Sequence, residues 1–427
     1  MTAARELVPA VGGTRLVPAP DPIAADYLRL GLRLDQHISG VVDGYFGPAD
    51  LKAEVDLEQR RPPARILADA RALAERVQRE IQEPGRRAWL ADQLVALEAQ
   101  ARTLAGEPMP YREQVELMMG FAPTIRDDAV FDAAAAVIDE HLPGPGSLEA
   151  RLEAWDATLE VPVDRLPAVV DWLLDRYRSK AAADFGLPEG EGLHIGLVRD
   201  QPWGAYNWYH GGRRSRVDIN TDLPVRASSL ILMIAHETYP GHHLEAAWKE
   251  AGLVDSAGSL EGSILLINTP ESPISEGLAD LGTSFASPLA ERADLLMELF
   301  DRAGMPVASD RALARVTAER AVELAAARDA LGAVRGNAAM RRHADSASHE
   351  DVLAYLQDVG RFSPEVAAKR LEFIEHPLWR TYAFVYADGA ALIERWLEAA
   401  PASERVGRFG RLLHEQLTPG RLLAELG

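Results

Sequence analysis

The spacing of apolar residues along the chain indicates a mainly helical protein. Apolar positions recur three and four residues apart among charged ones, which is the period of a helix with one buried face. This pattern holds over residues 63–81, 147–160, 166–186 and 311–342. Proline and glycine separate the helical stretches, so turns are expected between them.

The pattern changes between residues 186 and 225. Here HIGLVRD and GAYNWYHGGRRSRVDIN carry β-branched and aromatic residues around the Gly211-Gly212 pair, which predicts a short hairpin or small sheet near residues 193–220. The following segment, 225–252, has a strongly apolar first half and is predicted to be one helix. The expected fold is therefore a large, mainly α body with one small β element.

The chain divides into three stretches on this pattern. Residues 1–20 are expected to be an N-terminal extension, and residues 21–190 an N-terminal helical region. Residues 191–427 carry the candidate chemistry, and we expect them to form one continuous helical body with the preceding region.

Composition and charge narrow the range of partners. The formal net charge is −20, which argues against nucleic acid or an anionic membrane surface, since both attract basic proteins. A peptide or small molecule is the expected partner, and the oligomeric state stays open. The sequence predicts neither a signal peptide nor a membrane span, so a cytoplasmic location is expected. Because the chain has no cysteine, a transition metal would need His, Asp or Glu ligands.

One short stretch, AHETYPGHHLE at residues 235–245, concentrates candidate metal ligands. His236 and Glu237 match the start of the HExxH motif, in which a second histidine four residues later binds the same zinc ion and the Glu is the general base. The pair follows six uncharged, mostly apolar residues. Burying it would be costly without a charge partner, and a divalent cation is the simplest one.

The second histidine is displaced from its usual position. Position i+4 is Pro240, and the next histidines are His242 and His243. On a straight helix, i+6 lies roughly 240° around the axis and i+7 about 10 Å along it, so neither could share an ion with the first histidine. Proline followed by Gly241 permits a bulge. If the bulge absorbs two residues, His242 becomes the second ligand, with His243 as the alternative.

A third ligand is expected from a second helix downstream. The segment TPESPISEGLADLGTSFA, residues 269–286, has a helix start at Ser272-Pro273 and an acidic residue, Glu276, in its first turns. Asp280 lies on the same face and can accept the second N–H of a ligating histidine. The alternative is a solvated acidic face near a helix N-terminus.

HETYPGHHLE, followed by SEGLAD, resembles a bacterial family known as domain of unknown function 885. The signature of that family reads His-Glu-x-x-Pro-Gly-His-His, and the family is grouped with the zinc metallopeptidases of the gluzincin type. GVVDGYFGPADLKAEV at residues 40–55 is also similar to one branch of it. The resemblance implies a helical body with a deep cleft. It also implies a metal held at His236, His242 or His243, and Glu276, with Glu237 as base.

Further residues are candidates for binding the substrate. An edge strand can pair with an extended peptide, and the predicted hairpin offers Asn207, Tyr209 and His210 for this, unless it only packs on the helices. Hydrolysis also needs a donor to the oxyanion. Candidates near the C-terminus are Tyr382 and Tyr386 as donors, unless their hydroxyls are structural, and Arg380 for a substrate carboxylate.

These features together predict a metal-dependent hydrolase with one divalent ion, zinc, and a peptide substrate. In this hypothesis Glu237 deprotonates a metal-bound water while the ion polarises the scissile carbonyl. Two alternatives remain open: hydrolysis of another amide or an ester, and a metal- or peptide-binding protein without activity. The presence of Glu237 favours catalysis, because metal binding alone does not need a base there.

Overall fold

The computed structural model describes residues 21–201 and 203–427. The expected N-terminal extension, residues 1–20, lies outside the described residues. Within them the chain is mainly helical with two small sheets, which confirms the predicted fold class. No helix in the described part is long and apolar enough to span a membrane.

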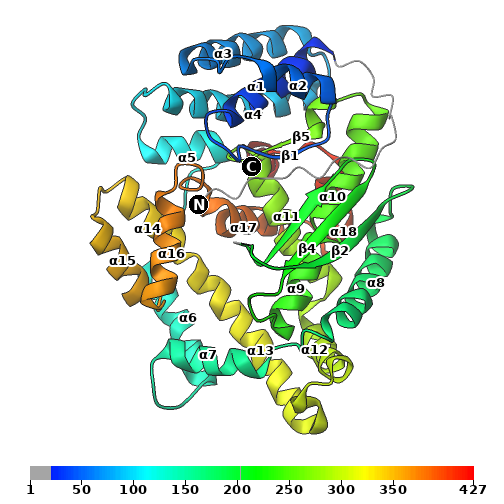
Figure 1. Cartoon of the computed structure of the whole chain (residues 1–427), viewed down its shortest axis with the longest axis vertical. Coiled ribbons are helices and arrows are strands. Elements are labelled where there is room, and N and C mark those ends of the chain that lie inside the picture. Colours follow the sequence, from blue (N-terminus) through cyan, green and yellow to red (C-terminus); the bar gives the residue numbers. More distant parts are fainter. Residues whose placement is uncertain (1–20, 202) are drawn as a thin grey trace.

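The N-terminal helices form a layer at one end of the molecule, at the top of Figure 1. This layer consists of α1 (Pro22–Asp35), α2 (Ala49–Leu57), α3 (Pro63–Glu80) and α4 (Pro84–Leu104). It is joined to the body by β1 (Val42–Tyr45), which pairs antiparallel with β5 (Ile264–Leu266). These strands are too short to produce a recognisable alternation, and the sequence analysis did not predict them.

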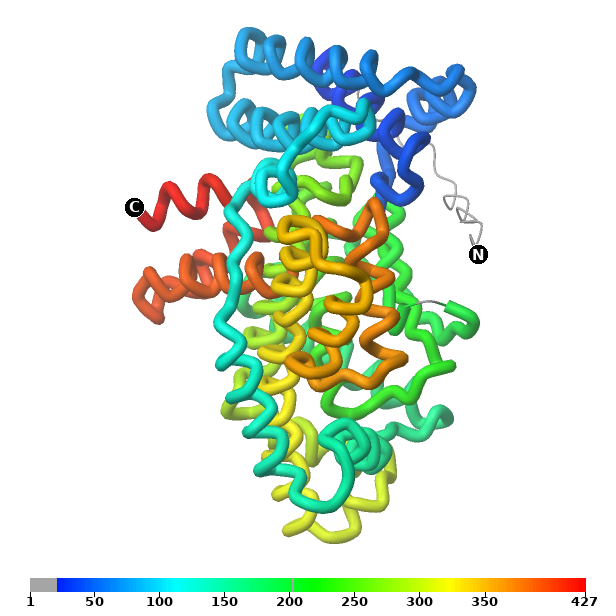
Figure 2. The backbone as a smooth tube through the Cα atoms, turned by 90° about the vertical axis from the view of Figure 1, so that its left-hand side faces the viewer, coloured from blue at the N-terminus to red at the C-terminus, as the bar shows by residue number. Residues whose placement is uncertain are grey.

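The body is built from helices, and the predicted stretches 147–160, 166–186, 269–286 and 311–342 all fall on helices. Its first half contains α5 (Tyr111–Met119), α6 (Asp128–His141), α7 (Leu148–Thr158) and α8 (Leu166–Phe185). Figure 2 shows the chain running from the N-terminal layer down one side of the molecule through α6. The second half contains α11 (Glu271–Ala286), α12 (Leu289–Ala303), α13 (Arg311–Gly332), α14 (Val334–His343), α15 (His349–Asp358), α16 (Pro364–Glu375), α17 (Val385–Glu398), α18 (Arg405–His414) and α19 (Pro419–Leu426). The predicted stretch 311–342 is thus divided after Gly332.

The three-stranded sheet lies where the sequence predicts β-structure. It contains β2 (Gly192–Val198), β3 (Ala205–Tyr209) and β4 (Arg214–Asn220) in the order β2-β4-β3. β3 and β4 form the predicted hairpin, and Gly211 and Gly212 in its turn have positive φ angles of 76° and 65°, which glycine adopts at little cost. β2 joins β4 in parallel, so β3 is an edge strand.

A buried asparagine ties three distant parts of the chain together. Gln100 of α4 donates from Nε2 to the carbonyl oxygens of Ile267 and Asn268. Asn268 in turn donates to the carbonyl of Leu378 and accepts from the Thr381 hydroxyl. The N-terminal layer, the turn before α11 and the segment before α17 are therefore fixed relative to one another.

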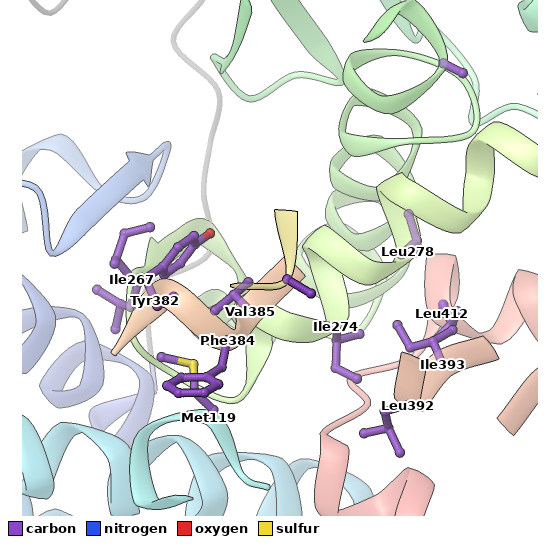
Figure 3. Close-up of a cluster of buried hydrophobic side chains, with 14 of the residues drawn as sticks. Met119, Ile267, Ile274, Leu278, Tyr382, Phe384, Val385, Leu392, Ile393 and Leu412 are labelled. Carbon is purple, nitrogen blue, oxygen red and sulfur yellow. The ribbon is translucent and has the colours of Figure 1, made fainter. Parts of the chain in front are cut away.

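Two glycines allow α11 and α17 to cross closely. Ile274 and Leu278 of α11 belong to the same buried cluster as Ile393 of α17 (Figure 3). A Cβ added to Gly277 would lie 2.8 Å from Cδ1 of Ile393, and one on Gly389 would lie 2.6 Å from the Pro273 carbonyl oxygen. The crossing leaves no room for a methyl group on either helix.

We expect Gly277→Ala to destabilise the protein by about 1–3 kcal/mol, because the methyl group would force the two helices apart. The measurement is the free energy of unfolding in urea. The matched control is Gly407→Ala, at an exposed helical position with nothing within 4 Å of an added Cβ. That variant should gain up to about 1 kcal/mol, since alanine favours helix. Equal stability of both variants would contradict a tight crossing.

Candidate metal centre

The predicted helix over residues 225–252 is broken in the middle. It consists of α9 (Ala227–Glu237) and α10 (His242–Lys249), followed by a π-helical segment, Glu250–Ser256. Across the break, the Gly241 amide donates to the Ala235 carbonyl and the Leu244 amide to the Thr238 carbonyl, at 3.1 and 3.2 Å. Both bonds span six residues instead of the usual four. The interruption therefore absorbs two residues, by separating two helices and not by bulging one.

This break brings His242 beside His236. Their Nε2 atoms are 3.1 Å apart and their ring planes are at 90°. His243 is fully buried on the other side, where Nδ1 lies 2.8 Å from Oγ of Ser215 and Nε2 lies 3.0 Å from Oε2 of Glu191. Both ring nitrogens of His243 therefore contact residues on the side away from His236 and His242.

Gly241 is required by the geometry of the break. Its Cα lies so close to the preceding turn that an added Cβ would be 1.8 Å from the carbonyl oxygen of His236. Pro240 lies against α11, because a Cβ added to Gly282 of that helix would be 3.2 Å from Cγ of the proline. Gly241 in the break and Gly282 on α11 thus let the break pack closely against α11. This helix carries the third candidate ligand.

Glu276 of α11 completes a triangle of candidate ligand atoms. Its Oε2 lies 3.5 Å from Nε2 of His236 and 3.7 Å from Nε2 of His242. Atoms bound at about 2.0–2.1 Å to a tetrahedral zinc ion lie about 3.3–3.4 Å from each other, so the three sides fit one ion. The same Oε2 is buried and accepts no hydrogen bond from the described residues.

Each of these three side chains is oriented by a second polar contact. Nδ1 of His236 lies 2.9 Å from Oδ1 of Asp280, and Nδ1 of His242 lies 3.3 Å from Oγ of Ser275. The Tyr382 hydroxyl donates to Oε1 of Glu276 at 2.8 Å. Partners of this kind fix the tautomer and orientation of ligands in metal sites and leave both histidine Nε2 atoms facing the third group.

The charges of the site favour a cation at its centre. Burial lowers the pKa of His236, but the neighbouring carboxylates of Asp280 and Glu276 outweigh burial and raise the pKa to about 10. The pKa of His242 is raised against burial by Glu245 and Glu276. The two histidines in turn hold the pKa of Glu276 well below its usual range, again against burial. The carboxylates therefore stabilise positive charge here, whether it comes from protons or from an ion.

Three further predicted residues, Glu237, Asn207 and Tyr386, lie near the triangle. The Glu237 carboxylate makes no hydrogen bond or ion pair within the described chain, and burial raises its pKa. Asn207 of β3 donates from Nδ2 to the Glu237 carbonyl at 2.7 Å. The ring of Tyr386 lies 5.8 Å from that of Tyr382. Burial raises the pKa of Tyr386 well above its usual range, so its hydroxyl stays protonated.

Three other predicted substrate-binding residues do not meet at this site. The Tyr209 hydroxyl donates to Glu250 at 2.5 Å; Tyr209 lies on the same face of β3 as Asn207 but two residues further along the strand. His210 is exposed beside the hairpin turn. Arg380 donates to Gln114 of α5, and thus serves packing between α5 and the segment before α17.

Two residues that support His242 were not predicted from the sequence. Glu245 lies one turn further along α10, with Oε2 3.9 Å from Nδ1 of His242, and it accepts from the Ser275 hydroxyl at 2.6 Å. A carboxylate three residues after a ligating histidine was a usable signal for Glu245. The hydroxyl of Ser275, one residue before Glu276, gave no distinctive pattern.

Comparison with known proteins shows a likeness in fold alone. No family model and no curated protein matches the chain. A structure described as the "putative lipoprotein from Colwellia psychrerythraea" is 15% identical with a TM-score of 0.51, over 84% of this chain and 65% of that one. Another, a "putative lipoprotein of unknown function from Shewanella oneidensis", is 12% identical with a TM-score of 0.46, over 94% and 82%. The chain thus spans less than two thirds of the first protein.

These findings contradict two expectations. The resemblance to the domain of unknown function 885 family is wrong, because no family model matches and the protein from Colwellia psychrerythraea is described as a putative lipoprotein. A motif of eight residues specifies local geometry, which recurs on unrelated folds. The expected cytoplasmic location is contradicted as well, since the protein from Colwellia psychrerythraea is described as a putative lipoprotein. The deep cleft implied by the resemblance stays an untested prediction.

We expect Gly241→Ala to weaken zinc binding by roughly tenfold or more, as loss of ligand orientation does in other metal sites. The added methyl group must displace the His236 carbonyl and with it His242. Zinc affinity is measured by competition with a chromogenic chelator. Gly252→Ala, in the nearby π-helical segment with nothing within 4 Å of an added Cβ, should bind zinc like the parent protein. Unchanged affinity in Gly241→Ala would show that the break does not aim His242.

Proposed function

We propose that the protein is a metal-dependent hydrolase of peptide or related amide bonds. The observation that carries this proposal is the triangle of His236, His242 and Glu276, whose sides of 3.1, 3.5 and 3.7 Å fit one divalent ion. Three protein ligands leave a fourth position open, as in catalytic zinc sites. The two histidines and the Glu are also only partly buried, with side-chain exposures of 18%, 22% and 14%, so a substrate can reach them.

The residues around the triangle support hydrolysis. When bound, a divalent ion would polarise a carbonyl and lower the pKa of a coordinated water. Glu237, which has no partner in the described chain, accepts the proton of the attacking water and delivers it to the leaving nitrogen. An unpaired carboxylate beside the ligands is available for this exchange, whereas Asp280 is already held by His236.

The two tyrosines have different roles in this proposal. The Tyr382 hydroxyl donates to Glu276 and so orients a ligand. The Tyr386 hydroxyl makes no hydrogen bond within the described residues and is free to donate to the oxyanion that develops at the scissile carbonyl. Edge strand β3, whose Asn207 contacts the backbone of Glu237, offers main-chain groups to an extended peptide.

We expect about one zinc ion per chain, because the site has a single set of three ligands. His236→Ala and Glu276→Ala should each lose the metal, as measured by elemental analysis after dialysis. The matched control is His210→Ala, which removes an exposed histidine outside the site and should keep full occupancy. Full occupancy in both ligand variants would refute the metal site.

We also expect Glu237→Gln to keep the metal and the fold but to reduce hydrolysis by roughly 10²- to 10⁴-fold or more, because the amide cannot accept the proton. Turnover is measured on a library of peptides together with ester analogues, which also tests the type of bond. Unchanged metal content with turnover near that of the parent protein would exclude Glu237 as the base.

A further inference from the structure

Two arginines near the metal centre lack a counter-charge. Arg335 on α14 and Arg370 on α16 form no hydrogen bond or ion pair with any residue the structure describes, and Nε of Arg370 is buried without a partner. This is unusual in a chain with 65 acidic and 45 basic residues. Most of its other partly buried arginines are paired, as Arg86 is with Glu261.

The surroundings of both guanidinium groups are aromatic and not acidic. Arg335 lies over the rings of Phe373 and Tyr386, 5.4 and 5.5 Å from their centres, and Arg370 lies 4.0 Å over Phe362. Aromatic faces stabilise a cation only in part. Burial and the charge of Arg335 lower the pKa of Arg370 to about 10, which still leaves it charged at neutral pH.

A row of aromatic rings connects Arg335 to the metal centre, and Arg370 is close enough to Arg335 to feel its charge. From Arg335 the row passes to Tyr386 and then to Tyr382, whose hydroxyl contacts Glu276. Tyr386 is also close enough to Glu276, Asp280 and Glu237 to feel their charges. Arg335 thus lies one side chain beyond the proposed oxyanion donor.

We propose that Arg335 and Arg370 form an anion subsite that binds a carboxylate of the substrate beside the metal centre. Guanidinium groups bind carboxylates through paired hydrogen bonds, and a ligand carboxylate would supply the counter-charge that the described chain does not. This inference rests on the proposed hydrolase function. Arg335 and Arg370 thereby take the role that the sequence suggested for Arg380, whose side chain donates to Gln114 instead.

A carboxylate can come from the C-terminus of a peptide or from an acidic side chain. Binding to zinc-loaded Glu237→Gln protein, which should not turn over its ligand, is therefore measured by calorimetry with three probes. These are N-acetyl-trialanine, its C-terminal amide, and the α-amide of N-acetyl-alanyl-glutamic acid, in which only the side chain is charged. Stronger binding of either charged probe than of the neutral amide is expected, and it identifies the source.

The same probes are then tested on Arg335→Gln and Arg370→Gln in the same background. Each change should weaken the preferred charged probe by roughly ten- to a hundredfold, as loss of a charged hydrogen bond does, and leave the neutral amide unaffected. Arg302→Gln is the matched control, because Arg302 also lies over an aromatic ring, Trp172, but is paired with Glu298. It should bind all three probes like the parent.

Thermal melting separates binding from a structural role. Without ligand, the two glutamine variants should melt no lower than the parent, because the charge they remove has no partner in the described chain. Lower melting of both, or equal binding of the charged probes to parent and variants, would overturn the subsite. Metal content and turnover of the parent protein test the hydrolase function separately. If the protein binds no zinc but still prefers the charged probe, the anion subsite stands and the proposed hydrolase function is wrong.

Discussion

The contact between Gly241 and the carbonyl of His236 is the constraint on which the candidate site depends. An α-helix carries residues six apart to different faces, so His236 and His242 could not meet on an unbroken one. Only a residue without a side chain lets the backbone fold back this tightly, and the two hydrogen bonds that span six residues hold it there. The second helix, α11, then packs on the break through Gly282 and carries Glu276 to the two histidines.

The polar groups of the metal centre comprise the three candidate ligands and the side chains that orient them. The three innermost groups face each other, and each is held from behind by a carboxylate or hydroxyl group. Such a cluster would be costly in an apolar interior if it stayed uncompensated. A cation at the centre makes every one of these contacts favourable at once. The neighbouring Arg335 and Arg370 show the opposite imbalance, an excess of positive charge without a carboxylate partner, and the proposed substrate would complement both regions.

The sequence predicted much of this arrangement, and the reasons are local. Periodicity specified the long helices, Gly211-Gly212 specified the hairpin, and the motif alone was enough to favour His242 over His243 once the helix was assumed to absorb two residues. The strands β1 and β5 were missed because so few residues carry no pattern. Arg335 and Arg370 were missed for a different reason: an arginine is distinctive only when its partners are known to be absent, and that requires the fold. The family resemblance failed because it relied on short segments, chiefly the histidine motif, that describe a site and not a whole chain.

The hydrogen bonds around Asn268 have a consequence for how this protein can be divided. The sequence suggested a boundary near residue 190, and the groups expected to do chemistry all lie after it. Yet Gln100, before that boundary, holds the turn that leads into α11, and Asn268 in that turn also anchors the segment that carries Tyr382. A fragment that starts at residue 191 would keep every candidate ligand but lose the brace that sets the spacing between them. The part of the chain that looks like an accessory is thus an inseparable portion of the scaffold, and gene fragments designed around the motif alone would omit it.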